Sequence, residues 1–150
     1  MSDTKTESWV QRAETTLAGA GHKRGGARRA MLELLADQSC ALTAVEIEDA
    51  LRSQQRAVSR ASVYRILEEL ERVQLVQRVE TGQAMVRYER VCGDSEEHHH
   101  HLVCDSCGVV MPFSDAALER AIAKVSERVP LAVVSEHEIV LHGACRQCAA

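Results

Sequence analysis

Two pairs of cysteines near the C-terminal end of this 150-residue chain have the spacing of metal ligands. Cys104-Asp-Ser-Cys107 and Cys145-Arg-Gln-Cys148 are C-x-x-C pairs with 37 residues between them. Each pair can bring two thiolates to one ion at about 2.3 Å, and two pairs complete a tetrahedral shell without an open position. Such a closed site stabilises a fold and does not activate water. The spacing therefore predicts a structural zinc ion bound by Cys104, Cys107, Cys145 and Cys148.

The cellular compartment bears on what the six cysteines can do. No apolar run reaches the length of a membrane helix, and the start MSDTKTESWVQ lacks the basic-then-apolar layout of a secretory signal. We expect a cytoplasmic protein without a membrane segment, in which cysteines bind metal or carry redox chemistry rather than form a disulfide framework. Thioredoxin-like redox pairs are the alternative, but no βαβ pattern surrounds either pair.

Four consecutive histidines, His98 to His101, precede the first cysteine pair. In an extended segment successive side chains point to opposite faces, so His98 and His100 face one way and His99 and His101 the other. One short strand can thus serve two separate metal sites. Further donors that could complete these sites are Glu89, Cys92, Glu119 and His137. The alternative is a solvated polar histidine tract.

The sequence argues against an enzyme. No His has Glu two places later and neither cysteine pair follows Pro, so the zinc-deaminase pattern is absent. There is no H-E-x-x-H or G-x-S-x-G motif, and the glycine-rich stretch 19–26 lies between predicted helices rather than after a strand. A metallohydrolase would need an open metal position beside a general base, for which Glu89 and Glu119 are the candidates.

Charge and metal-binding residue types divide the chain in two. Residues 1–90 carry 14 Lys and Arg against 13 Asp and Glu, whereas residues 91–150 carry 4 against 9. The second part also holds six of the seven His and five of the six Cys. We expect two domains, 1–91 and 92–150, the second too small to bury a large core without a metal or a partner subunit.

Apolar spacing predicts four helices and a hairpin in the first part. The first helix stops at the glycine-rich stretch, Thr43 is the expected N-cap of the third, and the fourth begins near Ser59. The strands are joined by a turn at 80–83. The expected positions, in chain order, are 9–17, 27–35, 43–51 and 59–73 for the helices, and Leu75–Val79 and Met85–Tyr88 for the strands.

Compact helices followed by a hairpin are typical of a winged helix-turn-helix, in which the fourth helix would enter the major groove of DNA. The exposed side of that helix begins with Arg60, Ser62, Tyr64 and Arg65. The alternative is a helical core with ordinary solvated arginines. Aromatic residues make up only 3% of the chain, which argues against a stacking platform for single-stranded nucleic acid.

The second part is predicted to be a small α+β unit. The polar segment Cys92–Glu97 is the expected hinge between the two parts. The expected helix has an apolar face that includes Leu118, Ile122 and Val125, and Pro130 follows it. The elements after the hinge are expected at 102–104, 109–113, 131–134 and 137–142 for strands and 115–129 for the helix.

Several of these motifs together resemble the ferric uptake regulator (Fur) family. They are, in order, Ala61-Ser-Val-Tyr-Arg65, Gly82 in the wing, the histidine run leading into Cys104-x-x-Cys107-Gly108, and Cys145-x-x-Cys148. The likeness covers almost the whole chain after about Gly21. It implies an α+β fold, with an N-terminal winged helix-turn-helix and a C-terminal α/β dimerisation domain that holds structural zinc. It also implies a homodimeric, metal-activated repressor, in which metal binding rotates the winged helices onto one palindromic operator of double-stranded DNA.

The resemblance also implies roles for individual residues. The structural zinc falls on the four paired cysteines, and the regulatory site on Glu89, His99 and His101, with Cys92 as the upstream cysteine that zinc sensors use. The third site falls on His98, His100, Glu119 and His137. The DNA contacts fall on Lys23, Arg28, Ser62, Tyr64 and Arg65, in addition to Arg60 from the helix pattern.

Departures from the family pattern leave the regulatory metal open between Zn²⁺ and Fe²⁺. Cys40 stands where iron sensors place a His, and thiolates from Cys40 or Cys92 would favour zinc. Glu89 favours iron, and Gln77 stands where zinc sensors have an acidic residue. The segment starting at Lys23 lacks the usual Thr and Pro or Gln. A peroxide sensor of the same family is a further alternative. A metal storage or trafficking protein is another, although it would not explain the arginines of the fourth helix.

Overall fold

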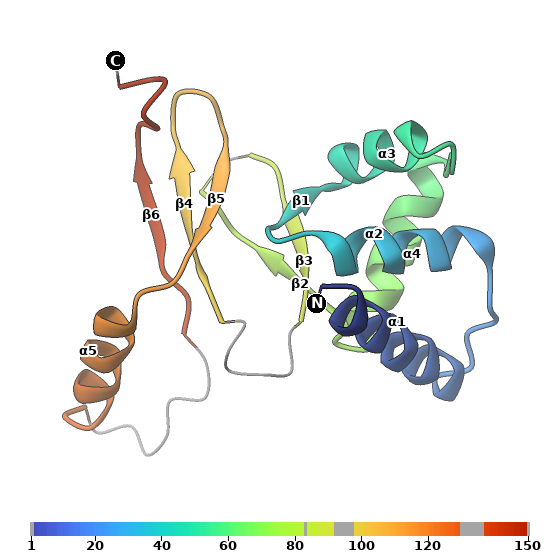
Figure 1. Cartoon of the computed structure of the whole chain (residues 1–150), viewed down its shortest axis with the longest axis horizontal. Helices are drawn as coiled ribbons and strands as arrows, with labels where there is room; N and C mark the ends of the chain where they lie inside the picture. Colours follow the sequence, from blue (N-terminus) through green and yellow to red (C-terminus); the bar gives the residue numbers. More distant parts are fainter. Residues whose placement is uncertain (1, 83, 92–97, 130–136, 150) are drawn as a thin grey trace. The chain divides into compact units, whose positions relative to one another are not determined.

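The structure is a computed structural model that describes residues 2–82, 84–91, 98–129 and 137–149 (Figure 1). The chain divides into two compact units, Met1–Cys92 and Gly93–Ala150, and each contains its own three-stranded sheet. Helices and sheets together confirm the α+β class. No helix in the described part of the chain is long and apolar enough to cross a bilayer.

Four helices form the core of the first unit. Their apolar faces meet around fully buried side chains that include Met31, Ile47, Leu51, Val63 and Leu70. These residues recur at the helical spacing read from the sequence, so the four predicted helices are confirmed. The helices are α1 (Ser2–Gly19), α2 (Gly26–Asp37), α3 (Ala44–Ser53) and α4 (Arg60–Arg72).

Local chemistry explains where these helices begin and end. Gly21 has φ of +84°, and the N–H of the next residue donates to the Leu17 carbonyl at 2.9 Å, which closes α1 with a left-handed glycine cap. The Thr43 hydroxyl accepts from the Glu46 N–H at 3.1 Å, and the Glu46 carboxylate accepts from the Thr43 N–H at 2.7 Å. This capping box starts α3. The Ser59 hydroxyl caps α4 by accepting from the Ser62 N–H at 3.3 Å.

The sheet of the first unit forms a wing with the order β1-β3-β2. Its strands are β1 (Leu42–Thr43), β2 (Val76–Val79) and β3 (Arg87–Arg90). The prediction of a strand at Met85–Tyr88 is wrong by two residues, because Val79 pairs with Arg87 and Met85 lies in the loop, 57% exposed. The apolar residues of the loop suggested a strand, whereas the real strand contains polar residues that are buried with partners. Arg87, for example, donates to the Ala41 carbonyl at 3.2 Å.

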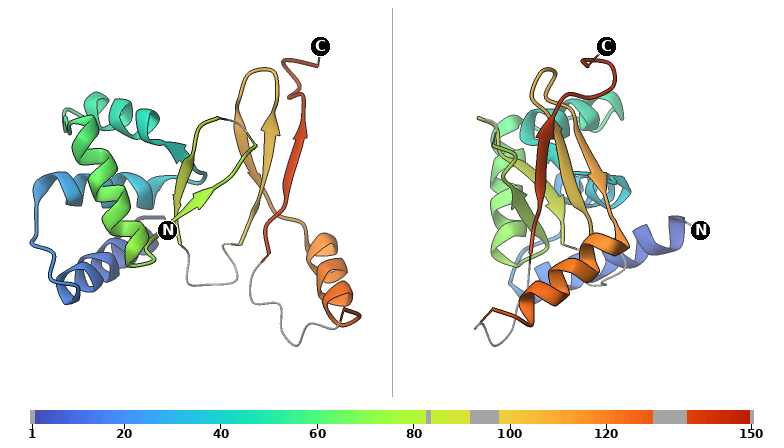
Figure 2. Two further views of the ribbon diagram at one scale, coloured as in Figure 1. Left: turned by 180° about the vertical axis from the view of Figure 1, so that it is seen from behind. Right: turned by 90° about the vertical axis from the view of Figure 1, so that its left-hand side faces the viewer.

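The second unit is a sheet with one helix. Strand β4 (His100–Cys104) lies in the centre, antiparallel to β5 (Val110–Phe113) and parallel to β6 (Val140–Gly143). Helix α5 (Ala116–Ser126) ends three residues before the predicted position and lies at the end of the sheet where β4 begins (Figures 1 and 2). The predicted hinge 92–97 and the predicted strand 131–134 lie outside the described residues.

The second unit buries few apolar side chains within one chain. Among its described residues, Val103 and Cys104 are the buried hydrophobic ones, and no residue of α5 is buried. Val125 on α5 is 56% exposed and Leu141 on β6 is 47% exposed. This agrees with the expectation that so small a unit needs a metal or a partner subunit.

Candidate metal centres and DNA-facing helix

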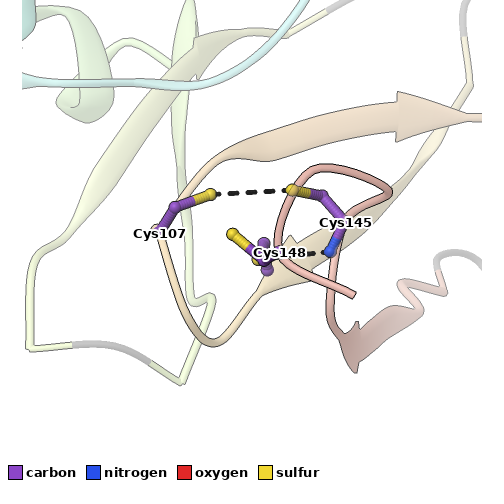
Figure 3. A group of neighbouring side chains, drawn as sticks. Cys107, Cys145 and Cys148 are labelled. Carbon is purple, nitrogen blue, oxygen red and sulfur yellow. Dashed lines mark hydrogen bonds between the residues drawn. The ribbon is translucent and has the colours of Figure 1, made fainter. Parts of the chain in front are cut away.

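The four predicted zinc ligands lie together where β4 and β6 end. One sulfur atom from each of Cys104, Cys107, Cys145 and Cys148 lies within 4.8 Å of the others. The sulfur atoms of Cys107 and Cys145 face each other at 3.9 Å, and that of Cys148 points toward the same centre (Figure 3). In a tetrahedron with Zn–S bonds of about 2.3 Å, neighbouring sulfur atoms are about 3.8 Å apart. None of the four cysteines forms a disulfide, and their arrangement fits one zinc ion.

Two tight turns aim these sulfur atoms. In the first turn the Gly108 N–H donates to the Cys104 carbonyl at 2.8 Å, and the φ of +75° at Gly108 is one that favours glycine. In the second, the Cys148 N–H donates to the Cys145 carbonyl at 2.9 Å. The Cys145 N–H donates to Cys104 Sγ and lowers the pKa of that thiol to about 6. Hydrogen bonds with the neighbouring thiols raise the pKa of Cys148 to about 12. Four clustered thiolates repel one another, so full deprotonation of the cluster needs a bound cation.

A second cluster joins β4, α5 and the segment before β6. Glu119 Oε1 is 2.7 Å from His100 Nε2, and Glu119 Oε2 is 2.9 Å from His137 Nε2. His98 Nε2 is 3.9 Å from Glu119. One donor atom from each of these four residues lies within 4.8 Å of the others, so the structure brings together the set assigned to the third site. Three imidazoles and a carboxylate suit Zn²⁺ or Fe²⁺.

The electrostatics of this second cluster favour the protonation states that bind metal. Burial lowers the pKa of His98, and charge on His100 and His137 lowers it further. A hydrogen bond from His100 lowers the pKa of Glu119. His98 is therefore neutral, and Glu119 ionised, over a wider pH range than in a free peptide, and metal ligands must be deprotonated. The Asp115 side chain accepts from two N–H groups at the start of α5 and so fixes the helix that carries Glu119.

The other two histidines of the run form a separate pair. The rings of His99 and His101 are 5.0 Å apart, and His101 is only 1% exposed. Glu138 Oε1 lies 3.5 Å from His101 Nδ1, a contact that the sequence analysis missed. The signal was present, because Glu138 follows His137 directly and its side chain points to the opposite face of an extended segment. In the segment before β6, His137 thus lies with the Glu119 cluster, whereas Glu138 lies with the His99 and His101 pair.

The remaining regulatory candidates belong to the first unit or lie outside the described residues. Glu89 lies on β3, is 7% exposed, and accepts a hydrogen bond from Gln77 Nε2 at 2.8 Å. Gln77 is the residue that stands where zinc sensors have an acidic side chain. Cys40 is partly exposed and forms no disulfide. Cys92 lies outside the described residues.

Helix α4 presents a polar, basic face. Tyr64 is 44% exposed, and the side chains of Arg60 and Arg65 are 59% and 63% exposed. Arg65 contacts Glu69 at 3.4 Å, and the Ser62 hydroxyl lies 3.0 Å from that of Ser59. Three of the four residues of α4 selected from the sequence for DNA, Arg60, Tyr64 and Arg65, are therefore exposed, and Ser62 is partly exposed.

Arg28 and Lys23 differ in accessibility. Lys23 is exposed and lines a hollow at the start of α2 together with Arg24. The Arg28 side chain is only 14% exposed, because it pairs with Glu69 and donates to the Lys23 carbonyl. Arg28 thus connects the segment before α2 to α4. These contacts lie within the first unit, and contact of Arg28 with DNA stays a prediction.

Comparisons with known proteins agree with this layout. Residues 19–142 match the sequence profile of the "Ferric uptake regulator family". The ferric uptake regulation protein of Neisseria meningitidis is 31% identical over 137 residues, which cover 89% of this chain and 91% of that protein. The peroxide operon regulator of Bacillus subtilis is 29% identical over 139 residues, covering 93% of this chain and 92% of that protein.

A solved structure extends the similarity to three dimensions. The Helicobacter pylori ferric uptake regulator, whose structure is described as revealing three functional metal binding sites, is 26% identical with a TM-score of 0.82. The match covers 97% of this chain and 94% of that one. A winged-helix unit followed by a sheet unit with thiolate and imidazole clusters defines a metal-responsive regulator. The chain belongs to the ferric uptake regulator family, whose members are transcriptional regulators and not enzymes.

Proposed function

We propose that this protein is a homodimeric repressor that binds a palindromic operator in double-stranded DNA when its regulatory site holds Zn²⁺ or Fe²⁺. It controls genes for the uptake of that metal, and it works in the cytoplasm, where its DNA lies. The observation that carries the proposal is the two-sided histidine run. His98 and His100 belong to one cluster, and His99 and His101 form another. The first unit exposes the basic face of α4, which we take as the recognition helix that enters the major groove.

Each metal site has a proposed role. The four paired cysteines hold structural zinc, and the cluster around Glu119 is the third site. The regulatory site combines His99 and His101 with Glu89 and Cys92, so it draws on the DNA-binding domain as well as the sheet domain. The metal supplies a positive centre that these separated donors share. The domain limits stay those proposed from the sequence, 1–91 and 92–150.

The dimer follows from the apolar surface of the second unit. Val125 on α5, Val129 just after that helix, and Met111 and Leu141 on the strands are between 38% and 56% exposed. Exposed apolar side chains on one small unit are typical of a protein interface. A second copy of the chain is the partner proposed to cover this surface, because a protein with twofold symmetry matches the twofold symmetry of a palindromic operator.

Regulation follows from linkage between metal and DNA. A conformation that brings Glu89 to His99 and His101 offers the complete donor set, whereas one that separates them does not. Metal binding shifts the population toward the complete site by the difference in affinity between the two states. If that conformation also lets both recognition helices reach the operator, metal and DNA affinity rise together. Because Arg and Lys neutralise phosphates, DNA affinity falls steeply with salt concentration.

The test is selection of duplexes from a random-sequence pool with buffered zinc, with anaerobic Fe²⁺, and with a chelator. Enrichment of an inverted repeat with one metal alone supports the proposal and identifies the signal. Equal retention of all sequences under the three conditions contradicts it. A response to iron that is lost after brief treatment with hydrogen peroxide would instead favour a peroxide sensor, the activity named for the Bacillus subtilis relative.

Three variants separate the candidate sensor ligands. Cys92→Ser should abolish zinc-dependent DNA binding if the site is of the thiolate type. Glu89→Gln should abolish the response if the carboxylate is the essential donor. Cys40→Ser tests the other candidate thiol, and a zinc response lost there but kept in Cys92→Ser would make Cys40 the thiolate donor. An unchanged zinc response in Cys92→Ser together with a lost response in Glu89→Gln would assign the site to Glu89 and the two histidines.

A further inference from the structure

Arg60 and Glu48 form an ion pair at the start of the recognition helix. Glu48 Oε2 accepts from Arg60 Nε at 2.7 Å, and Glu48 Oε1 accepts from Arg52 Nη2 at 2.8 Å. Glu48 is 8% exposed, whereas the side chain of Arg60 is 59% exposed. A buried carboxylate of α3 therefore holds an exposed guanidinium of α4. An ion pair with one exposed partner contributes little to stability, so its effect is on orientation.

The pair determines which donors of Arg60 face outward. The Nε–H is directed at Glu48, and no described residue accepts a hydrogen bond from the two terminal amino groups of the guanidinium. Arg60 is the first residue of α4 and lies four residues before Tyr64, so the two side chains share one exposed face. The N-terminus of a helix repels a positive charge, and Glu48 offsets this repulsion. The hydrogen bond from Arg60 lowers the pKa of Glu48, which keeps the carboxylate ionised.

We propose that Glu48 is a positioning residue that presents the terminal amino groups of Arg60 to a guanine in each half of the operator. The proposal rests on the proposed function, since it requires that α4 enters the major groove. Two parallel N–H donors match the O6 and N7 acceptors on the major-groove edge of guanine. The first residues of a recognition helix are those that contact base edges.

Charge balance supports this role for Glu48. An isolated carboxylate close to DNA would repel the phosphates. Here Glu48 pairs with both Arg52 and Arg60, and Asp49 pairs with Arg52 at 3.0 Å, so each carboxylate of the group has a cationic partner. Arg60 without Glu48 would be free to rotate toward the phosphates, which carry no direct sequence information. Glu48 therefore affects the choice of sequence more than the strength of binding.

The test measures base preference in the full-length protein with its activating metal. Each base pair of the selected operator is changed in turn, and the dissociation constant is measured at several salt concentrations. Wild type should prefer guanine at one position of each half-site by about 5-fold to 150-fold. Arg60→Ala should lose that preference and keep the others. Glu48→Ala should weaken it, and Glu48→Gln, which retains one acceptor oxygen, should be intermediate. Arg52→Ala, which removes the other partner of Glu48, is the matched control and should keep the preference.

Preference is a ratio within one variant, so a general loss of stability does not alter it. If Arg60→Ala weakens all duplexes equally and lowers the salt slope by about one unit, Arg60 contacts phosphate and the proposal is wrong. If Glu48→Ala keeps the full guanine preference, Glu48 does not position Arg60. If wild type binds no duplex with any metal, the proposed function itself fails. Metal-dependent binding with unchanged preferences in Arg60→Ala overturns this inference alone.

Discussion

The backbone N–H of Cys145 donates to Sγ of Cys104 at 3.3 Å, although the two residues are 41 positions apart in the chain. This hydrogen bond connects the turn after β6 to the last residue of β4, at the edge of a unit with few buried apolar side chains. The same sulfur atom belongs to the four-cysteine cluster. Zinc bound there would connect Cys145 and Cys148 to β4, the central strand of the sheet.

Loss of one cysteine from this cluster should therefore unfold the second unit. Cys145→Ser is expected to lose about one zinc ion per chain, because a closed four-thiolate shell supplies much of the folding free energy of a small domain. Zinc content by atomic absorption, together with thermal melting by circular dichroism, measures both effects. Cys40→Ser changes a thiol outside this cluster, so it is the control and should keep the structural zinc and the melting of the second unit. An unchanged melting curve in Cys145→Ser would contradict the structural role.

Glu119 should control metal affinity at the third site. Its carboxylate lies within 2.9 Å of both His100 and His137, and Glu119→Gln removes the negative charge at the centre of the cluster. We expect at least about a tenfold loss of affinity for the most weakly bound metal ion, measured by calorimetry after the structural zinc is loaded. Glu127→Gln, just after α5, is the control with an equal change of charge. Equal losses in both variants would indicate a general charge effect instead.

The contribution of His98 to metal binding at the third site should also depend on pH in a defined direction. The lowered pKa of His98 means that this imidazole loses its proton below the ordinary value of 6.5. Protonation of His98 should therefore weaken metal binding only when the pH drops through this lowered pKa, and titration of the metal at several pH values in wild type and in His98→Ala isolates this contribution. In the metal-free protein the lowered pKa of Glu119 stabilises the fold above the ordinary 4.5, and this stability is lost as pH falls through the folded value. Glu119→Gln should lack that acidic loss.

The sequence located the helices, and β2 and β5 almost to the residue, but it displaced β3 and missed β1. Met31, Ile47 and Leu70 recur at helical spacing, so the helices of the first unit could be located to within a few residues. Strand β1 has only two residues and no pattern of its own, since its pairing with β3 defines it. Arg87 is buried because it pairs with Glu46 at 2.9 Å, a contact 41 positions away that no local pattern reveals.

The candidate sites divide in the same way. Strict alternation in an extended strand was sufficient to separate His98 and His100 from His99 and His101, and the C-x-x-C spacing was sufficient for the zinc cluster. The sequence did not predict which carboxylates pair with Arg60 and Arg28. Glu48 and Glu69 lie one or more helical turns from any motif, and only the packing of the helices brings them to Arg60 and Arg28.

The apolar surface of α5 should be required for dimerisation. Val125 is 56% exposed in the single chain, so replacing it with Asp disturbs no packing within the described unit. A charge buried at an interface without a partner is costly, and Val125→Asp should shift the chain toward monomer. Sedimentation velocity measures the change, and Lys124→Asp on the neighbouring position is the control. If Val125→Asp remains as dimeric as Lys124→Asp, this part of α5 lies outside the interface.

The capping box of α3 should contribute measurably to the stability of the first unit. Thr43 is 4% exposed, and its hydroxyl accepts from the Glu46 N–H at 3.1 Å. Thr43→Ala leaves that N–H without its partner and should lower the free energy of unfolding by about 0.5–2 kcal/mol. Thr43→Ser keeps the hydroxyl and should recover most of the loss. Urea unfolding of the zinc-loaded protein measures the difference as a shift in midpoint at constant slope. If serine were as destabilising as alanine, the packing of the threonine methyl group, and not the cap, would be responsible.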